Sequence, residues 1–413
     1  MALFLLMKIR GLTANIEKYT MNKKNLLLVF IFWSFTLIGF AQEEVISIEG
    51  RIVNADTQEA VAFANVGIEG TSKGVASDVN GFFELKISYK YATHLLKVSA
   101  IGFFPYEIKL YEAKAKKNFT VNLKSVTYSL KSVNVYGESL VYRKLLRNAV
   151  ESIGRNYLQS PLSYTGYFKY SYSKAGTEEW KKESIVDIYD SEGYIRTDPA
   201  HTFNALNYAF SQVKKSREPL STIEGMTFFD DVLTCDIVRH TRNILDLEQS
   251  DRFILKNGGR FIYEGDSVQK IVYKSISPDI NVFGDADPVS YEGEIYINLK
   301  DKAVLKNILK TKLSSSSTLG KSFMPLRDDP SDLDVKIVTN YVKVNNRYFL
   351  KGISMVYDYR TSEGEITENF QYITERLNYT RPKVVKGRIY YESMSGNATL
   401  GHSYFKGESS SGD

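Results

Sequence analysis

The strongest constraint on this sequence is the alternation of apolar and polar residues with a period of two. Phe83, Leu85 and Ile87 alternate with polar residues, which predicts a strand with one buried and one solvated face. Short segments of this kind, broken by turn residues, follow one another over residues 46–124 with no helical period between them. They predict a small antiparallel β-sandwich. The same period returns in longer segments over residues 161–380, where we expect a larger, curved antiparallel sheet.

The composition agrees with a mainly β chain. The 413 residues include 29 Tyr and 23 Phe but only 9 Pro and 2 Trp, and aromatic side chains favour strands. Hydrophobic residues make up 43% and charged residues 24%, which excludes a disordered or collagen-like chain. The expected fold class is therefore mainly β: an N-terminal seven-strand-type β-sandwich, a linker helix, and a larger curved antiparallel sheet domain with a few helices.

Residues 1–41 have the features of an export signal. Met21 begins a short basic stretch, residues 26–40 form an apolar run of 15 residues, and Gly39 and Ala41 are small. This order predicts a signal peptide that is cleaved after Ala41, with Met21 as the true start. A membrane-spanning helix needs about 20 apolar residues, so an uncleaved anchor is the less favoured alternative.

Removal of the signal changes the charge of the chain. The net charge of +5 falls to +1 because residues 1–41 hold five cations and one anion. A nearly neutral chain lacks the basic field that nucleic acid requires, so nucleic acid is excluded as a partner. The residue directly after the cleavage position is Gln42 and not a cysteine, which excludes a lipoprotein anchor there. We expect export through the Sec pathway to the periplasm or the outer-membrane surface, and no lipoprotein.

Turn glycines and core positions occur together in residues 46–124. The matching segments are Gly50–Val53, Ala62–Ile68, Gly70-Thr71, Lys73-Gly74, Ser77-Asp78, Asn80–Phe82 and Ile101–Phe103. This pattern resembles the carboxypeptidase regulatory-like domain, a transthyretin-type β-sandwich found at the start of envelope proteins of Gram-negative bacteria. The resemblance implies that fold and location, and it implies no peptidase activity. We expect Gly70, Gly74 and Gly81 to occupy tight turns with positive φ.

A linker is expected over residues 125–160. Leu130–Gly137 resembles the short strand that follows this module in TonB-dependent receptors. A helix is predicted over Ser139–Tyr157, with Ser139 as the N-cap and an apolar stripe on one side. Further on, residues 203–215 and 227–247 have a mixed pattern that we interpret as helical.

The larger β region has two resemblances of its own. Tyr291–Asn298 followed by Lys302–Leu305 is similar to the strand–turn–strand repeat of periplasmic lipoprotein-carrier folds, in which a curved antiparallel sheet wraps an apolar face. Residues 161–380 also resemble the periplasmic portion of uncharacterised outer-membrane proteins, but the sequence stops before their barrel. Residues 381–413 are expected to form a flexible tail, and residues 393–413 within it are rich in Gly and Ser.

The sequence lacks the motifs of the common hydrolases and metal sites. No carboxylate stands three residues after His94, His201, His240 or His402, as a zinc carboxypeptidase would require. We therefore predict no metal site and no cofactor. The G-x-S-x-G pattern around Ser72 lies between two strands, whereas a nucleophile elbow leads from a strand into a helix.

Other polar motifs are equally weak. Ser171–Lys174 and Ser211–Lys214 match S-x-x-K without the accompanying motifs of the β-lactamase class. Asp78–Gly81 is interpreted as a hairpin turn and not a calcium loop, and Asp285–Asp287 as an ordinary acidic loop. We expect Cys235 to be a packed small residue, with an intermolecular bridge or a reactive thiol as alternatives. No catalytic residue is predicted.

The tyrosines allow two interpretations. They crowd two predicted strands, at Tyr164, Tyr167, Tyr170 and Tyr172 and at Tyr348, Tyr357 and Tyr359. Aromatic side chains on a wet sheet face would bind glycan, peptide or lipid. We favour the other interpretation, in which they cover the sheet and pair across strands.

Together these observations predict an exported, non-catalytic binding or assembly protein of the bacterial cell envelope. Its partner would be an envelope protein, a glycan or a lipid, with association to the outer membrane left open. One alternative is a periplasmic carrier of lipid or other apolar cargo on the C-terminal sheet. The other is an unrecognised hydrolase.

Overall fold

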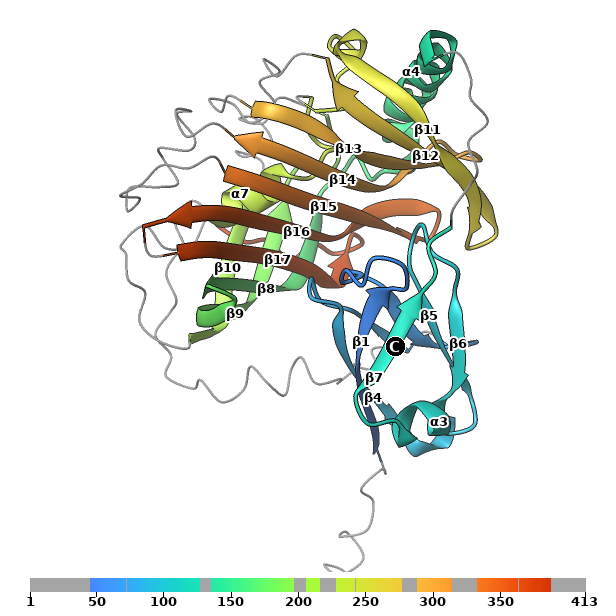
Figure 1. Cartoon of the computed structure of the whole chain (residues 1–413), viewed down its shortest axis with the longest axis vertical. Coiled ribbons are helices and arrows are strands. Elements are labelled where there is room, and N and C mark those ends of the chain that lie inside the picture. Colours follow the sequence, from blue (N-terminus) through green and yellow to red (C-terminus); the bar gives the residue numbers. More distant parts are fainter. Residues whose placement is uncertain are drawn as a thin grey trace, which may run out of the picture.

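The computed structural model is mainly β, as expected (Figure 1). It describes residues 45–71, 73–126, 135–196, 206–215, 228–241, 243–276, 288–313, 333–362 and 364–387. The expected signal region, Ser72 and the tail beyond residue 387 lie outside the described residues. Within them, two small sheets form an N-terminal sandwich and one ten-stranded sheet forms the larger unit.

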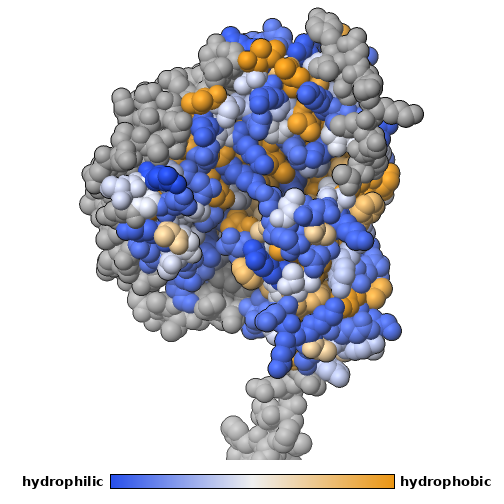
Figure 2. All heavy atoms as spheres, in the orientation of Figure 1, coloured by the Kyte–Doolittle hydropathy of each residue, from blue (hydrophilic) through white to orange (hydrophobic). Residues whose placement is uncertain are grey.

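The sandwich contains the expected seven strands. One sheet has the order β4 (Phe82–Ser88), β1 (Val45–Asn54) and β7 (Phe119–Leu123). The other has the order β3 (Gly74–Ala76), β2 (Asn65–Ile68), β5 (Leu95–Ser99) and β6 (Tyr106–Lys109). Phe83, Leu85 and Ile87 are buried in the core between the sheets, which confirms the alternation in β4. The sandwich surface in view is mostly hydrophilic (Figure 2).

The sandwich is not antiparallel throughout, and the prediction was wrong in this respect. Strands β1 and β7 pair in parallel, with Gly50 opposite Phe119. A parallel neighbour cannot be reached through a tight hairpin. The chain instead leaves β6 through a short helix, α3 (Leu110–Ala115), and a loop before β7 begins.

Two of the three expected turn glycines have positive φ. Gly70 and Gly81 have φ values of 75° and 80°, as tight turns require. Gly74 does not, and begins β3 instead. A Cβ atom at Gly74 would lie 2.8 Å from the carbonyl oxygen of Val66 on β2. Glycine is therefore needed there for the close approach of two strands.

The larger unit is a ten-stranded sheet in which all neighbours are antiparallel (Figure 1). Its order is β10 (Leu206–Lys215), β9 (Thr177–Asp190), β8 (Leu162–Lys174), β17 (Gly364–Asn378), β16 (Arg347–Thr361), β15 (Leu333–Val344), β14 (Val304–Leu313), β13 (Pro288–Asn298), β12 (Asp266–Ser275) and β11 (Phe253–Tyr263). Strands β8 and β17, which are the first and last strands of this unit along the chain, pair with each other.

Two segments differ from their helical interpretation. Residues 206–215 form β10, and Leu206, Tyr208 and Phe210 alternate into the core. The alternation was hidden because Ala209 on the other face is also apolar. In the second segment only α7 (Phe228–Thr234) is helical, and turns follow it.

The predicted linker helix exists but begins earlier than expected. Helix α4 spans Val135–Glu151 and the short helix α5 spans Ile153–Asn156. Val135 lies within the expected linker strand, of which residues 130–134 are outside the described residues. Ser139 is therefore inside α4 and is not its N-cap. Its Oγ instead accepts a hydrogen bond from the backbone N–H of Leu255, 3.1 Å away, which ties α4 to β11.

Helix α7 and the sandwich lie on opposite faces of the large sheet. On β17, Tyr372 contacts Phe229 of α7, with 5.8 Å between the ring centres. The next residue, Ile373, belongs to a separate apolar cluster with Phe63 of the sandwich and Val338 of β15. Successive strand residues point to opposite faces, so the large sheet is covered on both faces at this point.

The ring of Phe63 packs over Gly352, a sheet residue that has no side chain. Its ring is 6% exposed, and a Cβ atom on Gly352 of β16 would lie 2.8 Å from its Cε1. Phe63 also has φ of 58°, a conformation that non-glycine residues rarely adopt. One of the contacts that dock the sandwich is thus an aromatic ring packed over a glycine.

Replacement of Phe63 by alanine is expected to lower the free energy of unfolding by about 3 kcal/mol, because it leaves a cavity between the units. Urea unfolding of the two proteins measures this difference. The matched control is Phe104→Ala, since Phe104 is on the same unit but 56% exposed. Equal effects of the two substitutions would contradict the role of Phe63.

Candidate functional site

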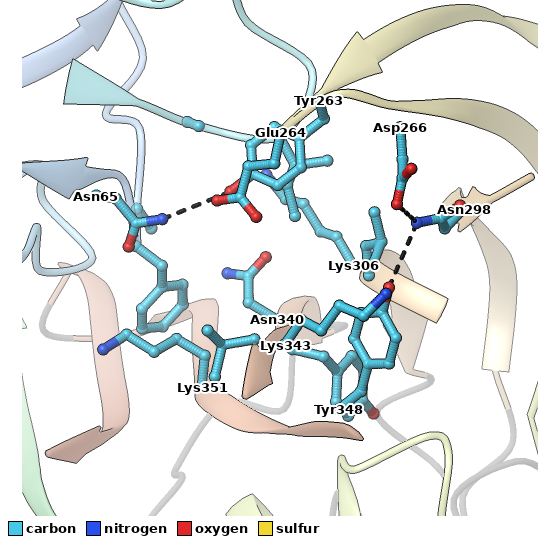
Figure 3. Close-up of a pocket in the computed structure, with 17 residues that line it drawn as sticks. Asn65, Tyr263, Glu264, Asp266, Asn298, Lys306, Asn340, Lys343, Tyr348 and Lys351 are labelled. Atoms are coloured by element: carbon cyan, nitrogen blue, oxygen red, sulfur yellow. Dashed lines mark hydrogen bonds between the residues drawn. The ribbon is translucent and has the colours of Figure 1, made fainter. Parts of the chain in front are cut away.

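A cavity of about 100 Å³ lies between the sandwich and the large sheet (Figure 3). The sandwich contributes residues from the start of β2 and from the loop after β5. The sheet contributes the turn between β11 and β12 and the facing parts of β13 to β16. Its polar lining residues include Asn65, Tyr263, Glu264, Asp266, Asn298, Lys306, Asn340, Lys343, Tyr348 and Lys351.

The β11–β12 hairpin brings its tip to the sandwich. Glu264 and Gly265, the two turn residues, have φ of 49° and 83°, and two positive values are what a tight type I′ hairpin turn needs. The turn places Tyr263 opposite Asn65, whose Nδ2 donates to the Tyr263 hydroxyl at 3.5 Å. Burial, with the nearby carboxylate of Glu264, raises the pKa of Tyr263. This contact closes one side of the cavity.

Lys306 and Asn340 stand side by side on β14 and β15, where the strand register pairs them. Each is only 6% exposed, and both line the cavity (Figure 3). Within the described residues neither side chain has a hydrogen bond or an ion pair. Nζ of Lys306 lies over the ring of Tyr296, 5.7 Å from the ring centre.

The electrostatic environment of Lys306 disfavours its charge. Burial lowers the pKa of Lys306 to about 8, and the positive charges of Lys336 and Lys270 act in the same direction. Glu294 opposes them, but its carboxylate is 2.6 Å from Nζ of Lys270 and accepts a hydrogen bond from Tyr296. The carboxylate of Glu294 is therefore already paired with Lys270 and Tyr296.

The other charges of the lining have partners. Nζ of Lys343 is 2.9 Å from Asp301, and Nζ of Lys351 donates to the carbonyl oxygen of Thr374 at 3.4 Å. Asp266 accepts a hydrogen bond from Asn298 at 2.9 Å, which lowers the pKa of its carboxyl group. Among the described charged residues of the cavity wall, Lys306 therefore differs in being both buried and unpaired.

A second buried polar cluster lies on the face covered by α7. Arg239 forms ion pairs with Asp190 and Asp236, and its guanidinium lies over the ring of Tyr194. Tyr341 donates to Asp236 at 2.6 Å, and burial raises the pKa of that carboxyl group. The space beside this cluster is about 10 Å³, at most enough for one water molecule. It is a closed network that fastens the loop after α7 to the sheet.

The residues considered as nucleophiles or ligands do not line the interdomain cavity. Cys235 is buried and its Sγ lies 3.5 Å from Sδ of Met355, which confirms it as a packed residue. His240 is buried in the loop after α7, 3% exposed, and Ser171 is buried within β8. Ser211 lies in β10 at a strand irregularity. The structure does not bring these residues together with the cavity.

The Asp78 motif is a hairpin turn, as predicted. The Asp78 carboxylate accepts hydrogen bonds from the backbone N–H groups of Asn80 and Phe82, at 2.9 and 2.7 Å. Burial raises the pKa of Asp78, and the charge of Lys169 on β8 opposes this shift. The turn therefore lies near the large sheet. Asp285–Asp287 is outside the described residues.

Most of the tyrosines singled out in the sequence are packed. Tyr164, Tyr170, Tyr348 and Tyr357 are each at most 8% exposed and belong to the main core. Tyr170 contacts Phe370 on the neighbouring strand, with 4.6 Å between the ring centres. This confirms that tyrosines pair across strands. Their number does not mark a binding face.

In the part of the chain that the structure describes, no three or more His, Cys, Asp or Glu side chains are grouped so that they could hold a metal ion. Its helices are also too short or too polar to cross a membrane.

The sequence reasoning missed Lys306, Asn340 and Tyr263. One signal was present: Lys306 and Asn307 interrupt an otherwise apolar stretch of β14. A strand that is covered on both faces reads as a nearly continuous apolar run, so polar residues in its middle are informative.

Comparison with known proteins supports the class of the N-terminal unit. Residues 48–135 match the family model of the CarboxypepD_reg-like domain, which confirms the resemblance seen in the sequence. The chain is thus a mainly β protein with such a domain docked on a large antiparallel sheet. No curated protein matches the sequence.

Three solved structures share low similarity with the chain. A domain described as an outer membrane lipoprotein-sorting protein, from Vibrio parahaemolyticus, is 8% identical with a TM-score of 0.24, covering 58% of this chain and 93% of its own. A DUF1329 family protein from Desulfovibrio piger is 9% identical with a TM-score of 0.25, covering 60% and 95%. A LolA superfamily protein from Nitrosomonas europaea is 11% identical with a TM-score of 0.22, covering 62% and 96%. With such low scores, no functional conclusion rests on them.

Replacement of Lys306 by methionine is expected to stabilise the folded protein at pH 7. A lysine whose folded pKa is about 8 and whose unfolded pKa is 10.5 costs on the order of 3 kcal/mol in its charged form. The unfolded chain binds more protons between these values, so the penalty fades as pH rises from about 8 to 10.5. Urea unfolding at pH 7 and pH 10 should show the advantage of the variant shrinking.

The control for this comparison is Lys274→Met. Lys274 lies on β12, two strands from Lys306, with a side chain 66% exposed, next to Glu292. Its replacement should change stability little at either pH. If both variants behave alike, Lys306 is not a buried and unpaired charge.

Proposed function

We propose that this chain is an exported, non-catalytic binding protein of the bacterial cell envelope, and that its ligand occupies the cavity between the sandwich and the large sheet. The observation that carries the proposal is the pair Lys306 and Asn340. Both side chains are buried in a cavity wall, and neither has a polar partner among the described residues. Buried polar groups are normally satisfied, so this pair is suited to a ligand.

The construction of the cavity supports a preformed site. Its walls come from two units that are held together by Phe63 and by the contact of Asn65 with Tyr263. Ligand sites occur preferentially at such interfaces, where a few polar groups fix the orientation of the ligand. A role in assembly follows in the same way if the ligand belongs to an envelope protein.

Export is supported by the sequence of residues 21–41 and by the CarboxypepD_reg-like domain. We place the protein in the periplasm or at the outer-membrane surface on this basis, with an envelope protein, glycan or lipid as the partner class.

The absence of catalysis is part of the proposal. Cys235 and His240 are buried on the other side of the sheet from Phe63 and do not line the cavity. The hydrolase alternative therefore has no support from the described geometry. Turnover of an ester or peptide substrate by the purified chain would overturn this part.

The carrier alternative predicts an apolar chamber under the large sheet. In the described residues that space is filled by the aromatic core, and the opening beside Arg239 is about 10 Å³. We expect organic extraction of the purified protein, followed by mass spectrometry, to yield no stoichiometric lipid. One lipid per chain would favour the carrier instead.

A ligand screen tests the cavity directly. We expect at least one compound, in a panel of neutral, cationic and anionic small molecules, to raise the melting temperature. The variant Asn340→Leu should weaken binding of that compound at least tenfold, because it removes the amide and keeps the side-chain size. Asn369→Leu is the control, since Asn369 lies on the same sheet face but outside the lining. A hit that is insensitive to Asn340→Leu binds elsewhere and contradicts the proposed site.

A further inference from the structure

The cavity has the features of a site for a small anion. Lys306 lies in its wall, only 6% exposed, without an ion pair or hydrogen bond among the described residues. A mostly buried ammonium group without an ion pair is disfavoured, because it has lost part of its hydration and gains only the ring of Tyr296 and the charge of Glu294, which Lys270 already engages. A ligand that carries a negative charge would supply the missing interaction.

The surroundings of Lys306 add positive potential. Lys270 and Lys336 both act on it, while Glu294 is held by Lys270 and by the hydroxyl of Tyr296. A neutral or cationic ligand would leave this potential unbalanced. An anion would be attracted by it, and the burial of Lys306 strengthens the attraction.

The neutral polar groups near Lys306 indicate which groups the rest of the ligand should carry. Asn340 is adjacent to Lys306 on the next strand, and its amide has no hydrogen bond among the described residues. Asn65 and Tyr263 form the opposite side (Figure 3). An anionic group at Lys306 would therefore meet an amide that can donate or accept. This suits a carboxylate or phosphate that is attached to a short polar body.

The size of the cavity limits the ligand further. A volume of about 100 Å³ suits a small molecule better than an acyl chain or an oligosaccharide. Lys343 already has Asp301, and Lys351 is directed to the backbone of Thr374. Among the described lysines of the wall, Lys306 therefore remains for one anionic group. The exposed carboxylate of Glu264 at the hairpin tip disfavours a polyanion.

We propose that this pocket binds a small organic anion whose single carboxylate or phosphate group pairs with Nζ of Lys306, while the amide of Asn340 holds the adjacent polar group. This assignment rests on the proposed function, since it names the ligand class of the same cavity. It makes Lys306 the residue that determines specificity for charge.

The experiment is calorimetric titration of the mature chain with matched pairs of probes. Acetate, lactate and glycine form the carboxylate arm, and inorganic phosphate and glycerol phosphate form the phosphate arm. Acetamide and glycerol are the neutral counterparts. We expect an anion from one arm to bind at least tenfold more tightly than its neutral counterpart, and the responding arm identifies the anionic group.

Variants connect the binding to Lys306. Lys306→Met should weaken anion binding at least tenfold, and it should fold well because it removes a buried charge. Lys274→Met, on the same sheet face but solvated and next to Glu292, should leave the affinity unchanged. As a second readout, the anion should raise the pKa of Lys306, measured from its side-chain NMR signals.

The possible failures are distinct. Binding of a neutral or cationic compound that is lost in Asn340→Leu but kept in Lys306→Met overturns the anion assignment and leaves the binding function in place. Anion binding that is unchanged by Lys306→Met also overturns the assignment. If neither the anions nor the wider panel bind at millimolar concentration, both the assignment and the proposed function are wrong.

Discussion

The packing of Phe63 over Gly352 is the contact on which the rest of the structure depends. Phe63 accepts a φ of 58°, and this places its ring on the sheet between Val338 and Ile373. Such a conformation persists only where surrounding contacts hold it. Asn65 follows two residues later at the start of β2, so the same contact sets its distance from the β11–β12 hairpin. Without this docking there would be two folded units and no cavity between them.

The sequence predicted the strands better than their partners. Period-two alternation locates a strand because it reflects the local geometry of the backbone, and it identified β4 and most of the large sheet. It carries no information on pairing between distant segments. The parallel contact of Gly50 with Phe119 and the contact of β8 with β17 were therefore not predicted. Where a strand is covered on both faces, as β16 is, the alternation itself fades.

The candidate site was harder to predict for a related reason. Lys306 and Asn340 lie in different strands, and each has the appearance of an ordinary polar residue of a half-solvated sheet. The sandwich covers this part of the sheet, and it packs there through Phe63 on a glycine far along the chain. The interruption of an apolar strand at Lys306 is the local signal, but it does not say what covers the strand.

The two buried polar clusters show why one is structural and the other suits a ligand. Arg239 has Asp190 and Asp236 as partners and a ring beneath it, so its charge is compensated by the chain itself. Lys306 lies near the ring of Tyr296 but has no ion pair among the described residues, so the charge that would compensate it must come from outside. The sandwich contributes a neutral amide to the cavity, while the sheet contributes the cation. Undocking would therefore return Lys306 to water and its pKa toward the ordinary value, so the affinity for an anion is coupled to the packing of Phe63.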